Sequence, residues 1–441
     1  MTVAQGNALR GFSSVDAPDP SIVSSCVHCG LCLNECPTYR VLRVEMDSPR
    51  GRIQLINAVQ DQRIALDSPS FLKHTFQCLD CRGCETACPS GVKYGTLIEA
   101  VRGQAVQADL LPTRRRLAQL ILRIVFQRLR LLRLAAQGLR IYQRSGLQTM
   151  VRRLGVLQRA APSLAAVEAL SPRISDKFLQ ASDLSFVPSD GEVRHRVSFI
   201  TGCIMAVAFA DAHRASLRVL ARNGCDIRIP EQQGCCGALH VHGGDRETAR
   251  KLARRNIDAF EVHQDEAIII NSAGCGSTLK EYGELLADDQ VYAVRAEAFS
   301  ARVKDFSEYL HEIGPIAPTG SISERVVYQD ACHLVHAQGI SRQPRELLCA
   351  VPGTELIEME NPTICCGAAG LYSVTDTEIS LSILNERLDA LEATGATVVV
   401  SANPGCLLHI QTGARRRGLN LRVMHVAEFL DDAYDHQGSE S

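Results

Sequence analysis

A cysteine motif that occurs twice near the start of the chain constrains the fold most strongly. In each copy three cysteines follow one another at steps of three, and a fourth lies further on, directly before a proline. The steps let one loop surround a cubane cluster, while the fourth cysteine reaches a second cluster. The motif therefore predicts two [4Fe–4S] clusters with crossed ligation. The predicted ligands are Cys26, Cys29, Cys32 and Cys88 for the first cluster, and Cys78, Cys81, Cys84 and Cys36 for the second.

Zinc is the main alternative at these cysteines, because paired C-x-x-C sequences also bind zinc. Two such pairs would satisfy zinc, however, and would leave the full C-x-x-C-x-x-C-x-x-x-C-P register unexplained. The register favours iron–sulfur clusters.

Cysteine usage also indicates a reducing compartment. Eighteen cysteines in 441 residues would be unusual as disulfides, which concentrate in small secreted domains, whereas metal-type spacings suit bound metal. The N-terminus lacks the apolar run of a secretory signal, and no uncharged apolar run reaches the roughly 18 residues of a transmembrane helix. We expect a cytoplasmic protein, with peripheral attachment to the cytoplasmic face of the inner membrane left open.

The first part of the chain is expected to form a helical domain. Residues 1–20 are polar and contain proline, which predicts a flexible leader, and the ferredoxin domain then spans 21–105. A helix should begin at Pro49, with Ser48 as its N-cap, and a second should cover Tyr94 to Val106. Because helices separate the two motifs, the cassette indicates a helical ferredoxin rather than a small bacterial one.

Residues 106–192 form a strongly basic region followed by a linker. No Asp or Glu occurs from Leu110 to Val167, while twelve arginines lie between Arg114 and Arg159. An apolar stripe recurs at helical spacing through Leu117, Leu120, Ile121, Ile124 and Val125. Such a helix suits an anionic lipid surface or a partner, but it also suits an internal brace with a packed stripe and solvated arginines. Aromatic residues for base stacking are not interleaved, so we expect no nucleic-acid partner. Prolines and polar residues over 161–192 indicate the linker.

The rest of the chain repeats itself, with offsets of 129 to 131 residues between matching segments. Short β-branched runs alternate with helical stretches at Ala206–Asn223, Asp245–Phe260 and Glu378–Ala393, which predicts tandem α/β modules with parallel sheets over 193–320 and 321–435. Ligands of such sheets bind beyond the carboxyl ends of the strands. Two sets of four thiols fall there: Cys203, Cys235, Cys236 and Cys275, then Cys332, Cys365, Cys366 and Cys406.

A doubled cysteine followed by glycine, repeated with matching partners, favours a metal site in each module. Either zinc or a further iron–sulfur cluster would satisfy four thiolates. His240, His242, His333 and His409 could assist, although each alone is expected to be a polar rim residue. Cys225 and Cys349 lie outside the pattern and are expected to be small buried hydrophobic residues.

These motifs together resemble the iron–sulfur subunits of bacterial glycolate oxidases. The surrounding sequence is similar too, for example Thr201-Gly-Cys-Ile-Met, Gln233-Gly-Cys-Cys-Gly-Ala-Leu-His and Val303-Lys-Asp-Phe-Ser-Glu-Tyr-Leu. The resemblance covers roughly residues 20–430. Related iron–sulfur subunits serve lactate-utilisation and anaerobic glycerol-3-phosphate dehydrogenase systems, and the cysteine-rich modules resemble the catalytic subunit of heterodisulfide reductase.

The resemblance implies an electron-transfer subunit of a quinone-linked glycolate oxidase. An FAD-containing subunit would oxidise glycolate, or D-lactate, and this chain would pass electrons toward membrane quinone. It would hold no substrate and no catalytic residues, which agrees with the lack of a G-x-G-x-x-G fingerprint.

Two alternatives stay open. One is a heterodisulfide-reductase-like enzyme acting at the modules, although the family's second C-x-x-C cysteine is replaced by Thr278 and His409. The other is a zinc-stabilised assembly module.

Overall fold

The computed structural model describes residues 11–435 except 156, 158, 160–164, 166, 167, 170 and 180. Residues 1–10 of the predicted leader, and the gaps between 156 and 180 in the basic region and linker, therefore lie outside the described residues. Among the described residues, no helix combines the length and the apolar character needed to cross a bilayer.

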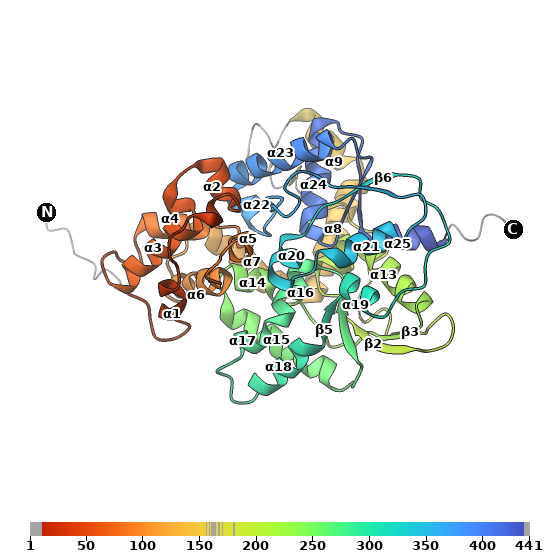
Figure 1. The fold of residues 1–441 in the computed structure, drawn as a ribbon, viewed down its shortest axis with the longest axis horizontal. Coiled ribbons are helices and arrows are strands. Elements are labelled where there is room, and N and C mark those ends of the chain that lie inside the picture. Colours follow the sequence, from red (N-terminus) through yellow and green to blue (C-terminus); the bar gives the residue numbers. More distant parts are fainter. Residues whose placement is uncertain are drawn as a thin grey trace.

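The N-terminal domain is helical and packs around its own apolar core, which includes Ile56, Phe71 and Leu97 (Figure 1). As the sequence predicted, Pro49 begins α3, and the hydroxyl of Ser48 accepts a hydrogen bond from the backbone N–H of Gly51 at 3.0 Å. The elements are α1 (Pro20–Ser24), η1 (Leu31–Leu33), α2 (Pro37–Leu42), η2 (Glu45–Asp47), α3 (Pro49–Gln60), α4 (Pro69–Phe76), α5 (Gly83–Thr86) and α6 (Tyr94–Gln107).

Residues 11–19 are anchored, although the sequence predicted a flexible leader over 1–20. The carboxylate of Asp16 is buried between the guanidinium groups of Arg246 and Arg250. The amide of Gln104 also bonds the backbone of Ser13. This segment therefore ties the helical domain to the region that follows the linker.

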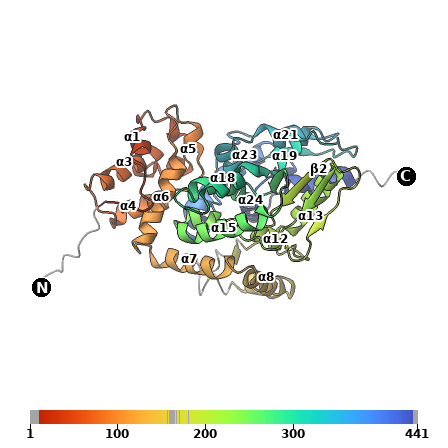
Figure 2. The same cartoon turned by 90° about the horizontal axis from the view of Figure 1, so that it is seen from below.

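Three basic helices come next: α7 (Thr113–Phe126), α8 (Leu129–Arg144) and α9 (Leu147–Leu154). In Figure 2, α7 and α8 run along one outer edge of the molecule. Leu132 and Ala136 of α8 are buried against the first module. The apolar stripe of α7 behaves differently, because Leu117, Leu120, Ile121 and Ile124 are exposed. Only Val125 of the predicted stripe packs inward, so the expected packing of this stripe on the protein itself is wrong for α7.

The first module surrounds a five-stranded sheet of order β1-β3-β2-β4-β5. Its strands are parallel apart from β1, which pairs antiparallel with β3. The predicted helix over Ala206–Asn223 is divided at Phe209, whereas the helix predicted over Asp245–Phe260 is present as α15. The elements are β1 (Phe186–Val187), β2 (His195–Phe199), α12 (Ile204–Ala208), α13 (Ala210–Arg222), β3 (Cys225–Arg228), α14 (Ala238–His242), α15 (Arg246–Glu261), β4 (Ala267–Ile270), α16 (Ala273–Lys280), α17 (Tyr282–Leu285), α18 (Ala293–Arg302), β5 (Val303–Asp305) and α19 (Phe306–Glu312).

The second module repeats this topology around a parallel sheet of order β7-β6-β8-β9. The predicted parallel sheets are thus confirmed. The elements are β6 (Arg325–Tyr328), α20 (Cys332–Gln338), α21 (Arg342–Cys349), β7 (Glu355–Ile357), α22 (Tyr372–Thr375), α23 (Thr377–Ala393), β8 (Val398–Ser401), α24 (Pro404–Arg417), β9 (Arg422–His425) and α25 (Val426–Asp435).

The final helix of each module packs against the other module as well as its own. The last helix of the second module, α25, packs on α13 of the first, and α19 of the first packs on α21 of the second. Arg218 on α13 forms an ion pair with Asp431 on α25. A single apolar core therefore continues through both sheets.

A buried histidine joins the modules at this core. The Nε2–H of His425 donates to the backbone carbonyl of Asn271 at 2.8 Å, and its Nδ1 accepts from the N–H of Ala427 at 3.0 Å. The ring is therefore neutral, with a fixed tautomer. Burial lowers the pKa of His425 to about 4, and it lowers the pKa of the nearby His213 to about 4 as well.

These two buried histidines should make the stability of the fold sensitive to acid. Their pKa values are about 4 in the folded chain and 6.5 without burial, so only the unfolded state gains the protons between these values. We expect the free energy of unfolding to fall as the pH drops from 6.5 toward 4, by on the order of 3 kcal/mol for each ring. His425→Gln should reduce this slope when chemical denaturation is followed across the window. An unchanged slope in the variant would contradict the assignment.

Candidate metal centres

The second predicted cluster set converges on one cavity. Cys36, Cys78, Cys81 and Cys84 all line it. Burial raises the pKa of the Cys84 thiol, and the neighbouring Cys81, Cys36 and Cys78 raise it further. The buried Cys36, Cys78 and Cys84 and the partly buried Cys81 form a suitable donor set for a [4Fe–4S] cluster. Cys36 comes from the other motif, as crossed ligation requires.

A buried arginine lies against this set. Nη1 of Arg52 is 4.0 Å from the sulfur of Cys36, and its Nη2 bonds Thr38 and Asp47. Its Nε–H donates to the carbonyl of His74 at 2.7 Å. A fully buried cation is costly unless its donors are paired. Here it would stabilise negative charge on the sulfurs, and the sequence pattern gave no sign of it.

The first predicted cluster set is more exposed to solvent than the second. Cys26, Cys32 and Cys88 pack against the helical core, whereas Cys29 is exposed. Burial, with nearby Cys36 and Cys26, raises the pKa of the Cys32 thiol to about 11. The structure thus brings Cys26 near Cys32, and it leaves the Cys29 side of the set facing solvent.

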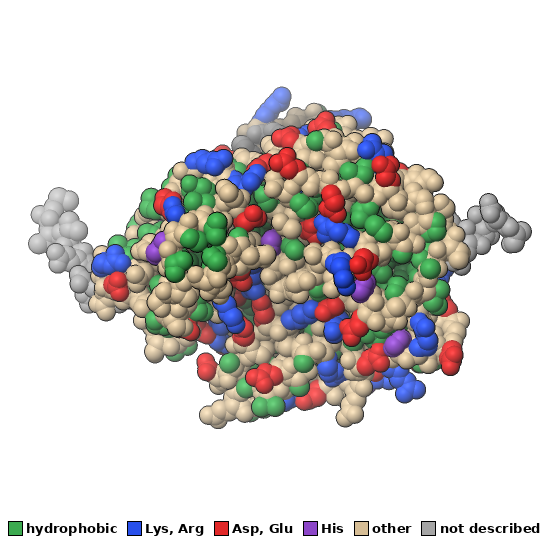
Figure 3. Space-filling view, in the orientation of Figure 1, with side chains coloured by type: hydrophobic (Ala, Val, Ile, Leu, Met, Phe, Trp, Pro, Cys, Tyr) green, Lys and Arg blue, Asp and Glu red, His purple; other side chains and the backbone are tan. Residues whose placement is uncertain are grey.

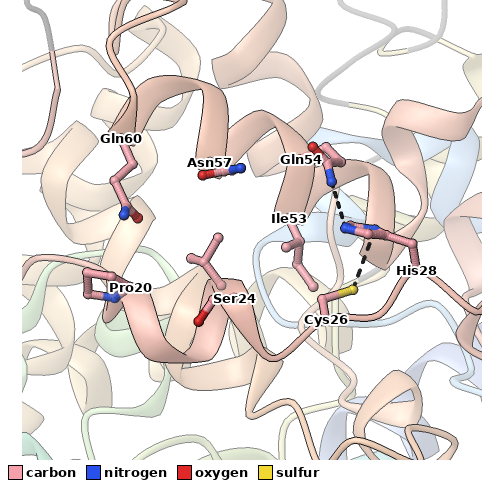
Figure 4. A pocket seen from close by; sticks show the side chains of 9 residues that line it. Pro20, Ser24, Cys26, His28, Ile53, Gln54, Asn57 and Gln60 are labelled. Carbon is pink, nitrogen blue, oxygen red and sulfur yellow. Dashed lines mark hydrogen bonds between the residues drawn. The ribbon is translucent and has the colours of Figure 1, made fainter.

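A cavity of about 190 Å³ opens beside Cys26 between α1 and α3. Figure 4 shows Gln54, Asn57 and Gln60 along one wall and His28 between Gln54 and Cys26. The amide of Gln54 donates to Nε2 of His28 at 2.7 Å, which leaves the protonated Nδ1 facing the Cys26 sulfur at 3.7 Å. His28 is therefore positioned to hydrogen-bond a cluster ligand.

Each module gathers its four predicted thiols in the same order. In the first, Cys203 neighbours Cys235, Cys235 neighbours Cys236, and Cys236 neighbours Cys275. The second module has the same sequence of contacts. They run from Cys332 through Cys365 and Cys366 to Cys406, with the last two sulfurs 3.2 Å apart.

Glycine has a specific role in both Cys-Cys-Gly turns. Gly237 has φ +88° and Gly367 has φ +89°, a conformation that other residues rarely adopt. A Cβ at Gly367 would also lie 2.7 Å from the carbonyl oxygen of Ser380. The turn that presents each cysteine pair therefore requires glycine.

The other cysteines and histidines follow the sequence predictions only in part. Cys225 is buried in β3, as predicted, but Cys349 is exposed at the end of α21, so its predicted burial is wrong. His240 and His409 are buried rather than at the rim. His333 is the histidine whose Nδ1 lies 3.4 Å from a module thiol, that of Cys332.

Charged residues join the ferredoxin domain to the modules. Arg82, between Cys81 and Gly83, pairs with Glu99 of its own domain and with Glu281 of the first module. Nδ1 of His242 bonds Asp80 at 3.1 Å and Glu99 at 3.0 Å. Although burial lowers the pKa of His242, these carboxylates raise it to about 9.

The same network has the donor types of a metal site. Ligand atoms of Asp80, Glu99 and His242 lie within 4.8 Å of one another. Arg82 and Arg102 already supply cations to the two carboxylates, however, so the group is an ion-pair network at the junction.

One thiol contact crosses this junction. The side chain of Cys81, from the second ferredoxin set, packs against that of Cys365 in the second module. The α5 helix that follows Cys81 also packs on α20, and Thr86 bonds His336 at 2.8 Å. Two of the predicted metal centres are therefore contiguous.

Three family models match the chain. A 4Fe-4S dicluster domain matches residues 22–92, a cysteine-rich domain matches 197–280 and 326–411, and the linker region of the glycolate oxidase iron–sulfur subunit matches 113–171. These matches cover the helical domain, both modules and the basic helices.

Curated relatives align over almost the whole chain. The probable glycolate oxidase iron–sulfur subunit of Bacillus subtilis is 40% identical over 96% of both chains. The glycolate oxidase iron–sulfur subunit of Escherichia coli is 31% identical over 95% of both. Lactate utilization protein A of Halalkalibacterium halodurans is 32% identical over 54% of this chain and 96% of its own length.

The geometry of the Cys-Cys-Gly turn predicts that Gly367→Ala strongly lowers the stability of the protein. The variant should lose about 2 kcal/mol or more of stability from the left-handed backbone and the contact with Ser380. Thermal unfolding would measure the loss. Gly418→Ala is the matched control, because Gly418 has φ +71° but nothing within 4 Å of its Cβ position. Equal losses in both variants would show that the close contact contributes nothing.

The contact between His28 and Cys26 predicts a redox effect. Hydrogen bonds to cluster sulfurs help to set the reduction potential, so His28→Leu should lower the potential of the first cluster. Redox titration followed by electron paramagnetic resonance would measure the shift, with the second cluster as internal reference. A shift confined to the second cluster would contradict this assignment.

Proposed function

Because the chain belongs to the family of glycolate oxidase iron–sulfur subunits, we propose that it is the electron-transfer subunit of a 2-hydroxy-acid oxidase. An FAD-containing partner would oxidise glycolate or D-lactate, and this chain would relay the electrons toward quinone at the membrane. No catalytic residue is assigned to this chain, since the substrate would be bound by the partner.

The contact between Cys81 and Cys365 carries the proposal. Iron–sulfur clusters would supply one-electron carriers at the cysteine sets. Cys26, Cys29, Cys32 and Cys88 would hold the first [4Fe–4S] cluster, and Cys36, Cys78, Cys81 and Cys84 the second. The contact extends this pair directly to the four thiols of the second module, which would hold a further iron–sulfur cluster or zinc.

The exposed end of this series is a suitable place for the electron donor. Cys29 is exposed, and so are the apolar residues Val27 and Leu31 in the same loop and Val44 and Met46 nearby. Hydrophobic side chains are also prominent over the helical domain in Figure 3. Exposed apolar patches commonly mark protein interfaces, so the flavoprotein would dock on this side.

The heterodisulfide-reductase alternative has less support. Thr278 and His409 occupy the positions of the additional cysteines, and each bonds within its own module: Thr278 to the carbonyl of Gly274, and His409 to Ser380. The zinc-only alternative also has less support, because residues 22–92 match a 4Fe-4S dicluster domain.

Cysteine substitutions test the proposal. Cys29→Ser or Cys81→Ser should stop electron flow to quinone while the flavoprotein partner still reduces an artificial dye. Iron and sulfide analysis after anaerobic purification should give about eight irons or more in the parent, from two four-iron clusters. Cys349→Ser is the control, because this exposed thiol belongs to none of the sets. Quinone reduction that survives both substitutions, or zinc without iron, would refute the relay.

A further inference from the structure

The α7 helix packs on the protein through polar anchors together with Leu122, Val125 and Phe126, and it turns its remaining aliphatic side toward solvent. Arg115 pairs with Asp376 and donates to the carbonyl of Phe76, while Gln119 donates to the carbonyl of Gly243 at 2.6 Å. Arg123 forms two bonds with Asp245. These residues recur at helical spacing, so they fix which side of α7 faces inward.

The opposite side of α7 is consequently an aliphatic strip. Leu117, Leu120, Ile121 and Ile124 are between 45% and 58% exposed. The next two helices also carry exposed apolar residues, and together with those of α7 they are called the aliphatic strip below. Leu134 and Ile141 of α8 are exposed, as are Leu147, Met150 and Leu154 of α9. An exposed apolar surface of this length is unusual in a protein that has nothing to bind there.

Positive charge accompanies the strip. Arg128 and Arg130, at the junction of α7 and α8, and Arg153 on α9 are exposed and form no ion pair with the described residues. No acidic residue occurs between 110 and 167. The nearest acidic partners along the outer edge, Asp109, Asp176 and Asp183, are already paired with arginines of these helices.

We propose that this aliphatic strip of α7–α9 binds the surface of an anionic phospholipid bilayer. Leucine, isoleucine and methionine side chains would enter the acyl boundary, and the neighbouring arginines would meet lipid phosphates. The α7 and α8 helices lie along one outer edge of the molecule (Figure 2). Attachment would be peripheral.

Composition favours a lipid surface over a protein partner. Protein interfaces are enriched in aromatic anchors, but the aromatic residues of these helices are used internally. Phe126 packs against the first module, and Tyr142 bonds Glu168. The exposed strip contains aliphatic residues only.

The inference does not depend on the electron-transfer role, and vesicle binding tests it without any redox step. The full chain should co-sediment with phosphatidylglycerol-containing vesicles, bind phosphatidylcholine vesicles less, and be partly released by salt. The triple variant L117Q/L120Q/I121Q should bind the anionic vesicles about tenfold or more weakly. Its thermal stability should be unchanged, since all three side chains are exposed.

Matched variants separate a specific surface from general stickiness. V262Q/V291Q/V294Q changes three exposed valines elsewhere and should bind like the parent. R128E/R130E should weaken binding to anionic vesicles only, whereas K251E/R342E, a charge reversal at exposed sites elsewhere, should not. Reversal of Arg115 is unsuitable, because Arg115 holds α7 in place.

The proposal fails if the parent chain does not bind anionic vesicles, or if the α7 triple variant binds as the parent does. It also fails if the parent does not bind vesicles and the triple variant loses self-association, measured by sedimentation velocity, or flavoprotein binding, measured by pull-down. The surface would then belong to a protein contact.

Discussion

Buried ion pairs hold the helical domain against the modules. Arg82 links Glu99 to Glu281, and Arg102 donates to the carbonyl of His242 on the first module. Breaking one member of such a network leaves an unpaired buried charge, which costs several kcal/mol. The arrangement therefore specifies one geometry of docking. That geometry places Cys81 against Cys365, so the proximity of the two centres depends on charged residues that are not themselves predicted cluster ligands.

The cysteine sets could be predicted from sequence because their chemistry is local. Cluster-binding loops need thiols at fixed spacing, and a repeat in the sequence marks corresponding places in two parallel sheets. The junction could not be predicted in the same way. Arg82 stands inside a cluster motif, but its partner Glu281 lies on another module, and no local pattern links a charge to a partner so distant in the chain.

The basic helices show a second limit. The periodicity of the sequence revealed two sides of α7 without showing which side packs on the protein. The usual preference would bury the apolar stripe, but most of that stripe is exposed. Asp245 and Asp376 reverse it by pairing with Arg123 and Arg115. These acidic residues belong to the modules, so the orientation of α7 is a property of the tertiary structure.

The shared packing of α19 and α25 bears on how such a chain can evolve. Two repeats with a clear sequence boundary look like parts that could be separated, lost or shuffled. In this structure the last helix of each repeat also packs on the other repeat, and one apolar core runs through both sheets. Loss of one repeat would therefore expose an apolar surface on the other, whereas the two metal centres could diverge in chemistry while their scaffolds stay together.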